Sequence, residues 1–237
     1  MKLVVFITHH FCGEFINTLF KVNTSIMNAA DYKIIVLFDN QHNDKYDDVL
    51  EKSLKNIEII KISKINTSYD DKGHSLYIHY FKRNREEIRK YEYIWIIEND
   101  VYYPNSFLEF TKKHDIYKHD LLVSEYGLRS PLWPWLKTLK GFKHTQQIGV
   151  LAVILRFSQK LLLKLIDTID TDYFGYLEAI LPHICIENKL SIQQFLPETC
   201  GILTTNSRLP FLAFIQKDIQ ENKRNFIENK IYHPIKL

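Results

Sequence analysis

The sequence predicts an α/β fold, in which a mostly parallel central sheet carries helices on both faces. Short apolar runs alternate with amphipathic segments over roughly the first 100 residues, a pattern typical of strand–helix units. The runs are almost continuously apolar, as expected for strands covered on both sides. A chain of 237 residues with 46% hydrophobic residues is also long enough for one large domain with a full core.

In the first half, apolar runs predict strands over residues 3–7, 33–38, 58–62 and 93–97. Helical periodicity predicts helices over 14–28 and 75–89, and the second of these has a basic, aromatic-bearing face. In the second half, strands are expected over 120–123 and 148–155, with a loop at 133–135 between them. Helices are expected over 158–168, with Ser158 as the N-cap, and over 173–188, where Pro182 introduces a kink.

Three of the predicted strands end in polar or acidic residues. Thr8, His9 and His10 follow the first strand, Asp39 and Asn40 follow the second, and Glu98-Asn99-Asp100 follows the strand over 93–97. Ligands of parallel α/β sheets bind beyond the carboxyl ends of the strands. We therefore expect these residues to converge on one site.

Glu98 and Asp100 are the most informative of these residues. Residues two apart in a strand point to the same side, and two carboxylates held close together repel each other unless a cation or a shared proton relieves them. Mg²⁺ and Mn²⁺ favour oxygen ligands of this kind and often share them with substrate phosphates. The alternative is a solvated turn that closes the strand through local hydrogen bonds.

Composition narrows the set of partners and the compartment. The formal charge is +3 and the Lys and Arg residues are dispersed, so the sequence predicts no nucleic-acid partner. A phosphate-bearing small molecule or peripheral association with an anionic membrane surface stays open.

Cys12, Cys185 and Cys200 are odd in number and widely spaced, which disfavours a disulfide framework or a cysteine zinc site. Without a signal peptide or a run of about 20 apolar residues, we expect a cytoplasmic protein, soluble or peripheral at the membrane.

Several segments, in their order, resemble nucleotide-sugar-dependent glycosyltransferases of the GT-A fold. These segments are KLVVFITHH, KIIVLFDN, YEYIWIIENDVYYPNSF, HDLLVSEYG, WPWL, ILRFSQKLLLKL, YLEAILPHICIENKL and YHPIK. The resemblance touches most of the chain and implies a single GT-A-like, Rossmann-like domain over 1–237. Residues 1–103 would form the nucleotide-binding half, and 104–237 the acceptor-binding half with a C-terminal tail.

The resemblance also implies roles for individual residues. Glu98 and Asp100 match the acidic metal-binding motif, in which Glu stands here at the first place instead of Asp, and His233 matches a late histidine that completes the metal site. The positions that match nucleotide contacts are Thr8, His9, Asp39 and Asn40. Glu178 matches the acceptor-side carboxylate that serves as catalytic base in inverting members. The implied cofactor is Mn²⁺ or Mg²⁺, the donor a nucleoside diphosphate sugar, and the acceptor a glycan, lipid-linked or protein group.

Sugar transfer from such a donor needs stabilisation of the departing diphosphate by the metal, assisted by basic side chains. Lys82 and Arg83 are candidates for phosphate contact, although the sequence alone favours a solvated helix face for them. Trp133 and Trp135 are candidates for stacking on sugar rings, or for filling the core.

Two other functions fit part of the pattern. One is a nucleotidyltransferase, which also places acidic metal ligands on an α/β sheet. The residues after the first strand contain a single glycine, Gly13, and lack a glycine-rich phosphate loop, which counts against this enzyme class. The other is a catalytically inactive binding or scaffold module that retains the fold.

Overall fold

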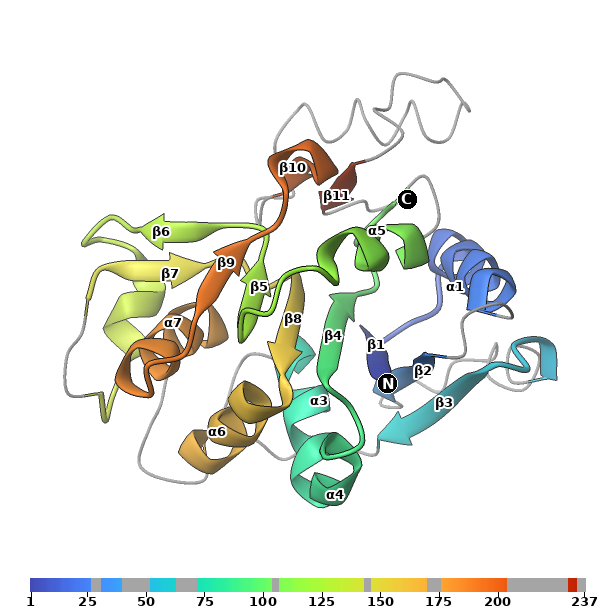
Figure 1. Ribbon diagram of the computed structural model, residues 1–237, viewed down its shortest axis with the longest axis horizontal. Helices are drawn as coiled ribbons and strands as arrows, with labels where there is room; N and C mark the ends of the chain where they lie inside the picture. Colours follow the sequence, from blue (N-terminus) through green and yellow to red (C-terminus); the bar gives the residue numbers. More distant parts are fainter. Residues whose placement is uncertain are drawn as a thin grey trace.

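The computed structural model contains a seven-stranded mixed sheet with helices packed on both faces (Figure 1). It describes residues 1–26, 31–39, 52–62, 72–103, 107–142, 146–169, 176–203 and 230–233. The strands of the sheet are β1 (Lys2–Thr8), β2 (Tyr32–Asp39), β3 (Ile57–Ile62), β4 (Tyr93–Glu98), β5 (Leu121–Val123), β8 (Ile154–Ser158) and β9 (Ile192–Gln194). The predicted α/β class, the mostly parallel sheet and its two helical layers are confirmed.

Strand order in this sheet is β3-β2-β1-β4-β8-β5-β9. Neighbouring strands pair in parallel except at β8, which runs antiparallel to both β4 and β5. The chain builds outward from β1 to β3 and then returns to place β4 on the other side of β1. The strand order therefore reverses between β1 and β4, which makes their carboxyl ends a topological switch point. Open α/β sheets bind their ligands at such points.

Alternating residues of the central strands pack into two hydrophobic clusters, one on each face of the sheet. One face is covered by α3 (Lys72–Arg83), α4 (Arg85–Ile88), α6 (Gln159–Ile169) and α7 (Leu177–Glu187). The other face is covered by α1 (Gly13–Ile26) and α5 (Phe107–His114). Burial on both faces explains why these strands read as continuous apolar runs.

Two small sheets extend the molecule. The antiparallel pair of β6 (Tyr126–Leu128) and β7 (Ile148–Val150) lies to the left in Figure 1, and a short 3₁₀ helix, η2 (Pro134–Thr138), lies between them in the chain. The parallel pair of β10 (Cys200–Leu203) and β11 (Ile231–His233) lies above the β4 end of the sheet, with β10 preceded by η3 (Pro197–Thr199).

Three predicted elements need correction. The run 148–155 is not one strand: β7 and β8 belong to different sheets, and Leu151, Ala152 and Val153 between them are also buried, so the bend does not interrupt the apolar run. The helix predicted over 75–89 divides at Asn84 into α3 and α4. Of the predicted loop at 133–135, Trp133 caps η2, and Pro134 and Trp135 belong to it.

Other expectations are confirmed in detail. The predicted helix over 158–168 corresponds to α6, and the backbone N–H of Leu161 donates to Ser158 Oγ at 3.1 Å, as an N-cap requires. The helix carrying Glu178 and Pro182 is observed as α7, whose bounds lie within the predicted range 173–188. Among the described helices, none combines the length and apolar character that crossing a bilayer requires.

Candidate metal centre

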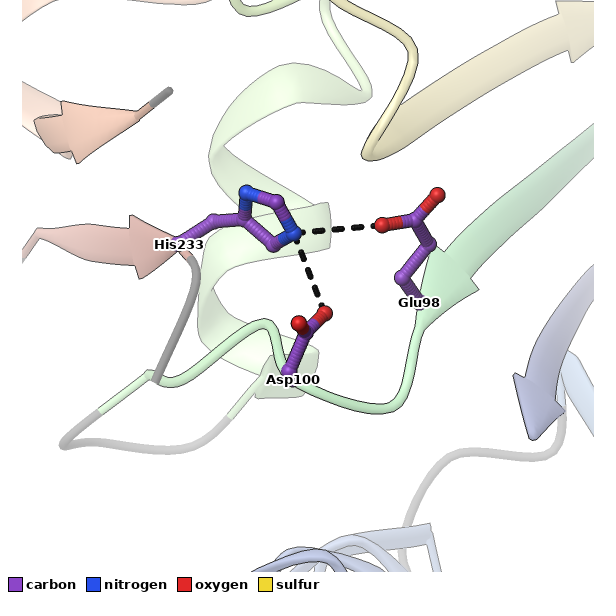
Figure 2. A group of neighbouring side chains, drawn as sticks. All are labelled: Glu98, Asp100 and His233. Carbon is purple, nitrogen blue, oxygen red and sulfur yellow. Dashed lines mark hydrogen bonds and ion pairs between the residues drawn. The ribbon is translucent and has the colours of Figure 1, made fainter. Parts of the chain in front are cut away.

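The end of β4 presents two carboxylates on one side of the sheet edge. The side chains of Val4, Phe6, Trp95 and Ile97 are buried and pack the central strands into the core. After Glu98 the chain turns, with the Val101 N–H donating to the Glu98 carbonyl at 3.2 Å. This turn brings Asp100 back beside Glu98, so that both acidic groups face the same point (Figure 2).

His233 reaches this point from the far end of the chain. Tyr232 and Tyr102 exchange two backbone hydrogen bonds, each 2.9 Å long, which attach β11 to the segment that follows β4. His233 Nε2 then lies 3.1 Å from Glu98 Oε2 and 3.0 Å from Asp100 Oδ1 (Figure 2). The structure thus brings together the three residues that the sequence nominated as metal ligands.

Burial and charge differ among the three groups. The His233 side chain is 6% exposed, whereas those of Glu98 and Asp100 are 26% and 24% exposed. Burial lowers the pKa of His233, but its hydrogen bonds to Asp100 and Glu98 and their negative charges outweigh this effect and raise the pKa to about 9. At neutral pH and without an ion, a proton on His233 therefore balances part of the carboxylate charge.

The donor set also fits a divalent cation. One ligand atom from each of the three residues can be chosen so that all lie within 4.8 Å of one another. Ligands about 2.1 Å from an octahedral ion, at right angles to each other, are about 3 Å apart, which matches the separations between Nε2 and the two carboxylate oxygens. Two oxygens and one imidazole suit Mn²⁺ or Mg²⁺ better than they suit a thiolate-seeking metal.

The carboxyl ends of β1 and β2 lie beside this cluster. The register pairs Ile7 with Glu98 and Thr8 with Phe38, so Thr8 and Asp39 are at the same edge of the sheet as the acidic pair. Thr8 is buried and its Oγ1 accepts from the His10 N–H at 3.1 Å, which shapes the turn after β1. For the residues that the structure describes, these strand ends lie along one edge of the sheet, as their convergence on one site would require; Asn40 lies outside the described residues.

Asp39 has an unusual environment for a carboxylate. The residue is 8% exposed, yet no described group donates a hydrogen bond to its Oδ1. A buried carboxylate oxygen without a donor is costly. A ligand that donates a hydroxyl or N–H group at the end of β2 would remove this cost.

His9 and His10 do not alternate between the two faces of the sheet as adjacent residues of a strand do. Both are exposed and lie just past β1, and their rings are 4.5 Å apart between centroids. Because the chain has already left the strand at this point, adjacent side chains no longer point to opposite faces. His9 therefore lies at the edge that holds Thr8 and Asp39.

The structure does not bring every nominated residue to the cluster. Lys82 and Arg83 are in the last turn of α3, which leads through α4 to the first residue of β4. The end of α3 therefore lies toward the opposite end of β4 from Glu98. Glu178 is in the first turn of α7, a helix that packs against β7 and η2, and is not a member of the three-residue cluster.

Trp133 and Trp135 are both half-buried. Their ring centroids are 6.5 Å apart, and the Trp135 ring packs on Tyr176 at 4.3 Å. Both tryptophans belong to the segment between β6 and β7, which the structure places on the side of the sheet distant from β1 to β3.

Sequence reasoning missed Ser124, which follows β5. Because β5 runs parallel to β4 through the antiparallel β8, Ser124 lies at the same edge of the sheet as Glu98. Its Oγ is buried and has no hydrogen-bond partner among the described groups. The signal was present in the sequence, since a polar residue directly follows the apolar run 121–123.

Gly201 offers a test of the support for His233. A Cβ at this position would lie 2.4 Å from Tyr232 Cε1, so Gly201→Ala must displace the ring next to His233. We expect a roughly tenfold loss of Mn²⁺ affinity, comparable to the loss of a group that orients a ligand, measured by titration calorimetry. In the control Gly127→Ala, the new Cβ meets nothing within 4 Å. Equal affinities in the two variants would contradict this role for the β10–β11 pair.

No protein-family model matches this chain, and a comparison with curated proteins finds no significant match.

Proposed function

We propose that this protein is a metal-dependent glycosyltransferase of the GT-A type, which moves a sugar from a nucleoside diphosphate sugar to a glycan, lipid-linked or protein acceptor. The observation that carries the proposal is the convergence of Glu98, Asp100 and His233 at the carboxyl end of β4. A cluster of this composition at a topological switch point is suited to an ion that is shared with a phosphorylated ligand.

In this proposal Glu98, Asp100 and His233 hold Mn²⁺ or Mg²⁺, which when bound neutralises charge on the departing diphosphate. The residues at the ends of β1 and β2 bind the nucleoside. Asp39 Oδ1, buried and without a described donor, accepts a hydrogen bond from a ribose hydroxyl or a base N–H. Thr8 and the exposed His9 line the same edge.

Glu178 is the proposed base for an inverting reaction. It would take the proton from the acceptor hydroxyl as the oxygen forms its bond to the sugar carbon and the diphosphate leaves. Its support is the resemblance of YLEAILPH to the acceptor side of such enzymes, together with its position in the first turn of α7.

The nucleotidyltransferase alternative receives no support from the turn after β1. That turn is built on the Thr8 side chain and contains no glycine before Gly13, where α1 begins. Enzymes that hold a triphosphate at this place use a glycine-rich loop whose backbone N–H groups surround the phosphates.

A binding or scaffold module is the second candidate, because one observation favours it. His233 with its raised pKa balances the two carboxylates by keeping a proton, so the cluster can attach β11 to β4 without an ion. In that case the three residues are a structural ion-pair cluster and no nucleotide site is needed.

Thermal unfolding with added ligands separates these candidates. With Mn²⁺, one of UDP or GDP at about 100 times its dissociation constant should stabilise the protein by roughly 2.7 kcal/mol. For a chain of this size that is a rise in Tm of about 5–10 °C. The shift should be absent in Asp100→Ala and retained in Asp31→Asn, which changes an exposed carboxylate at the opposite end of β2.

The pH dependence of the ion alone provides a control. Mn²⁺ must displace the His233 proton, so its effect on Tm should increase as the pH rises toward 9. No Tm shift with any nucleoside diphosphate, together with an Mn²⁺ effect that Asp100→Ala leaves unchanged, would favour the scaffold and reject the enzyme.

A further inference from the structure

The antiparallel ribbon of β6 and β7 has two glycines directly opposite each other. The register pairs Gly127 with Gly149. The same register continues past the ends of both strands: the Arg129 N–H donates to the Gln147 carbonyl at 2.7 Å, and the Glu125 carbonyl accepts from an N–H of the facing segment at 3.0 Å. Opposite residues share a face and side chains alternate along each strand. All five residues therefore lie on one side of the ribbon.

Trp133 lies on this same side. A Cβ at Gly149 would be 2.4 Å from the Trp133 ring and 3.0 Å from Arg129 Cγ, so both side chains cover this glycine. The Arg129 guanidinium carbon lies 5.3 Å from the centroid of the Trp133 ring. Trp133 is only half-buried, so part of its indole packs on the ribbon and part is exposed to solvent.

The space above Gly127 is open. A Cβ at this position would meet no atom of the described residues within 4 Å. Glu125 and Arg129, two residues before and two residues after this glycine, form an ion pair across it. The Cβ positions of opposite residues in a ribbon are about 5 Å apart, so the indole that covers Gly149 borders the open space. Backbone forms its floor, and polar and aromatic groups form its sides.

The polar groups at this space have unused hydrogen-bonding capacity. The side chain of Glu125 is 50% exposed and that of Arg129 is 19% exposed. Arg129 Nε is buried, and no described group accepts a hydrogen bond from it. Gln147 is exposed on the same side. Carboxylate, guanidinium and amide groups are planar and offer two neighbouring acceptors or donors, which match two neighbouring hydroxyl groups.

We propose that this side of the ribbon binds an uncharged sugar unit, which makes the acceptor of the transfer a glycan. The apolar face of the sugar ring packs on Trp133, and its hydroxyls bond to Glu125, Arg129 and Gln147. As an assignment of the acceptor, the inference rests on the proposed function. The binding of the sugar itself does not depend on the ion or on the nucleotide.

The chemistry of the surface favours a neutral sugar over other occupants. Glu125 and Arg129 balance each other's charge, so a simple anion or cation would meet one attractive and one repulsive group. An apolar partner would cover the carboxylate and the Arg129 Nε without a hydrogen bond to either, which is costly. A sugar has both an apolar face and hydroxyls that donate and accept.

The ribbon begins at the edge of the sheet that holds the candidate metal centre. Glu125 lies two residues after the end of β5, and only β8 separates β5 from β4 in the sheet. Two strand spacings amount to about 10 Å. A glycan with one sugar unit on the ribbon is therefore long enough to bring another of its units toward Glu98 and Asp100.

Saturation-transfer NMR without metal ion or nucleotide tests the proposal. The probes are four neutral sugars: lactose, maltose, cellobiose and methyl α-mannoside. The wild-type protein should bind at least one of them. Gly127→Val should weaken this binding by tenfold or more, because its side chain fills the open space. Since nothing described lies within 4 Å of the new Cβ and valine suits a strand, the Tm should stay within about 2 °C of the wild-type value.

Removal of the proposed contacts gives a second measurement. Trp133→Ala should lower the affinity by about tenfold through loss of the aromatic contact. Glu125→Gln keeps the size of an exposed side chain and should lower the affinity by about fivefold, because a charged acceptor becomes a neutral one. Leu128→Ser is the control on the opposite side of the same ribbon, where the side chain is 84% exposed. Glu86→Gln, in a side chain 82% exposed on α4, is the control for charge. Both controls should bind as the wild type does.

Two results would overturn the proposal: binding of none of the four sugars, or equal losses in the test and control variants. Either result leaves the stabilisation by Mn²⁺ with UDP or GDP as a separate test of the nucleotide site. Conversely, sugar binding that Gly127→Val abolishes, in a protein that no nucleoside diphosphate stabilises, supports the sugar site and rejects the transferase.

Discussion

Asp100→Asn is expected to lower the rate of metal-dependent release of nucleoside diphosphate from a nucleotide sugar by about 100-fold or more. Asp100 Oδ1 lies 3.0 Å from His233 Nε2, at the point where the proposed ion would bind. An amide keeps the size of the side chain but removes its negative charge. Since removal of groups that merely orient metal ligands costs 10- to 100-fold, loss of a ligand should cost at least the upper value.

The measurement is steady-state hydrolysis or transfer over a panel of nucleotide sugars with Mn²⁺. Asp167→Asn is the matched control: Asp167 is an exposed carboxylate on α6 that pairs with Arg85. A circular dichroism melt should show both variants folded. Activity of Asp100→Asn within threefold of wild type, with the Mn²⁺ requirement retained, would reject Asp100 as a metal ligand.

The second large effect is expected at Arg156, which the sequence alone did not single out. This residue of β8 is 0% exposed. Its Nη1 donates to the His114 carbonyl at 2.9 Å, and its Nη2 donates to the carbonyls of Tyr117 and His119 at 2.6 and 3.2 Å. One guanidinium thus serves the C-terminus of α5 and the chain that follows it.

Two effects oppose each other at Arg156: the cost of burying its charge and the gain from its hydrogen bonds. Burial lowers its pKa to about 10, so the group remains charged at neutral pH at a cost in desolvation. Against this, the guanidinium satisfies three carbonyls, interacts favourably with a helix C-terminus and lies 3.9 Å from the centroid of the Tyr93 ring. We expect the second effect to be larger, because replacement leaves carbonyls without donors in a buried region.

Arg156→Met should therefore lower the free energy of unfolding by about 2–4 kcal/mol, which corresponds to a fall in Tm of roughly 5–15 °C. Arg156→Lys should recover only part of the loss, since a single ammonium cannot span three carbonyls. Lys164→Met, on the exposed side of α6, is the control. A loss below about 1 kcal/mol for Arg156→Met would show that desolvation cancels the hydrogen bonds.

Sequence patterns were most informative where burial and local structure agree. The strands β1, β2, β3 and β4 were predicted within one residue at each end, because residues buried on both faces form uniform apolar runs. The same uniformity concealed the bend at 151–153, where every residue is also buried. The short strands β6, β9, β10 and β11 were not predicted, since three or four residues show too little periodicity.

The residues of the candidate metal centre also differ in whether the sequence could predict their positions. The acidic pair at the end of an apolar strand could be expected from the sequence, but the turn after Glu98, and not strand alternation, places Asp100 beside it. The nomination of His233 came from resemblance alone, because no local rule relates positions 135 residues apart. The roles suggested for Lys82 and Arg83 did not take account of the direction of α3, which carries them toward the amino-terminal edge.

The sequence by itself determined the layered α/β fold and the acidic end of β4, because both depend on the periodicity and burial of short segments. Only the tertiary structure decided which distant groups meet there. The Tyr102–Tyr232 pairing brings the imidazole of His233 to the two carboxylates, and strand order places Thr8, Asp39 and Ser124 along the same edge. These contacts arise from strand pairing between segments far apart in the chain, which local patterns do not encode.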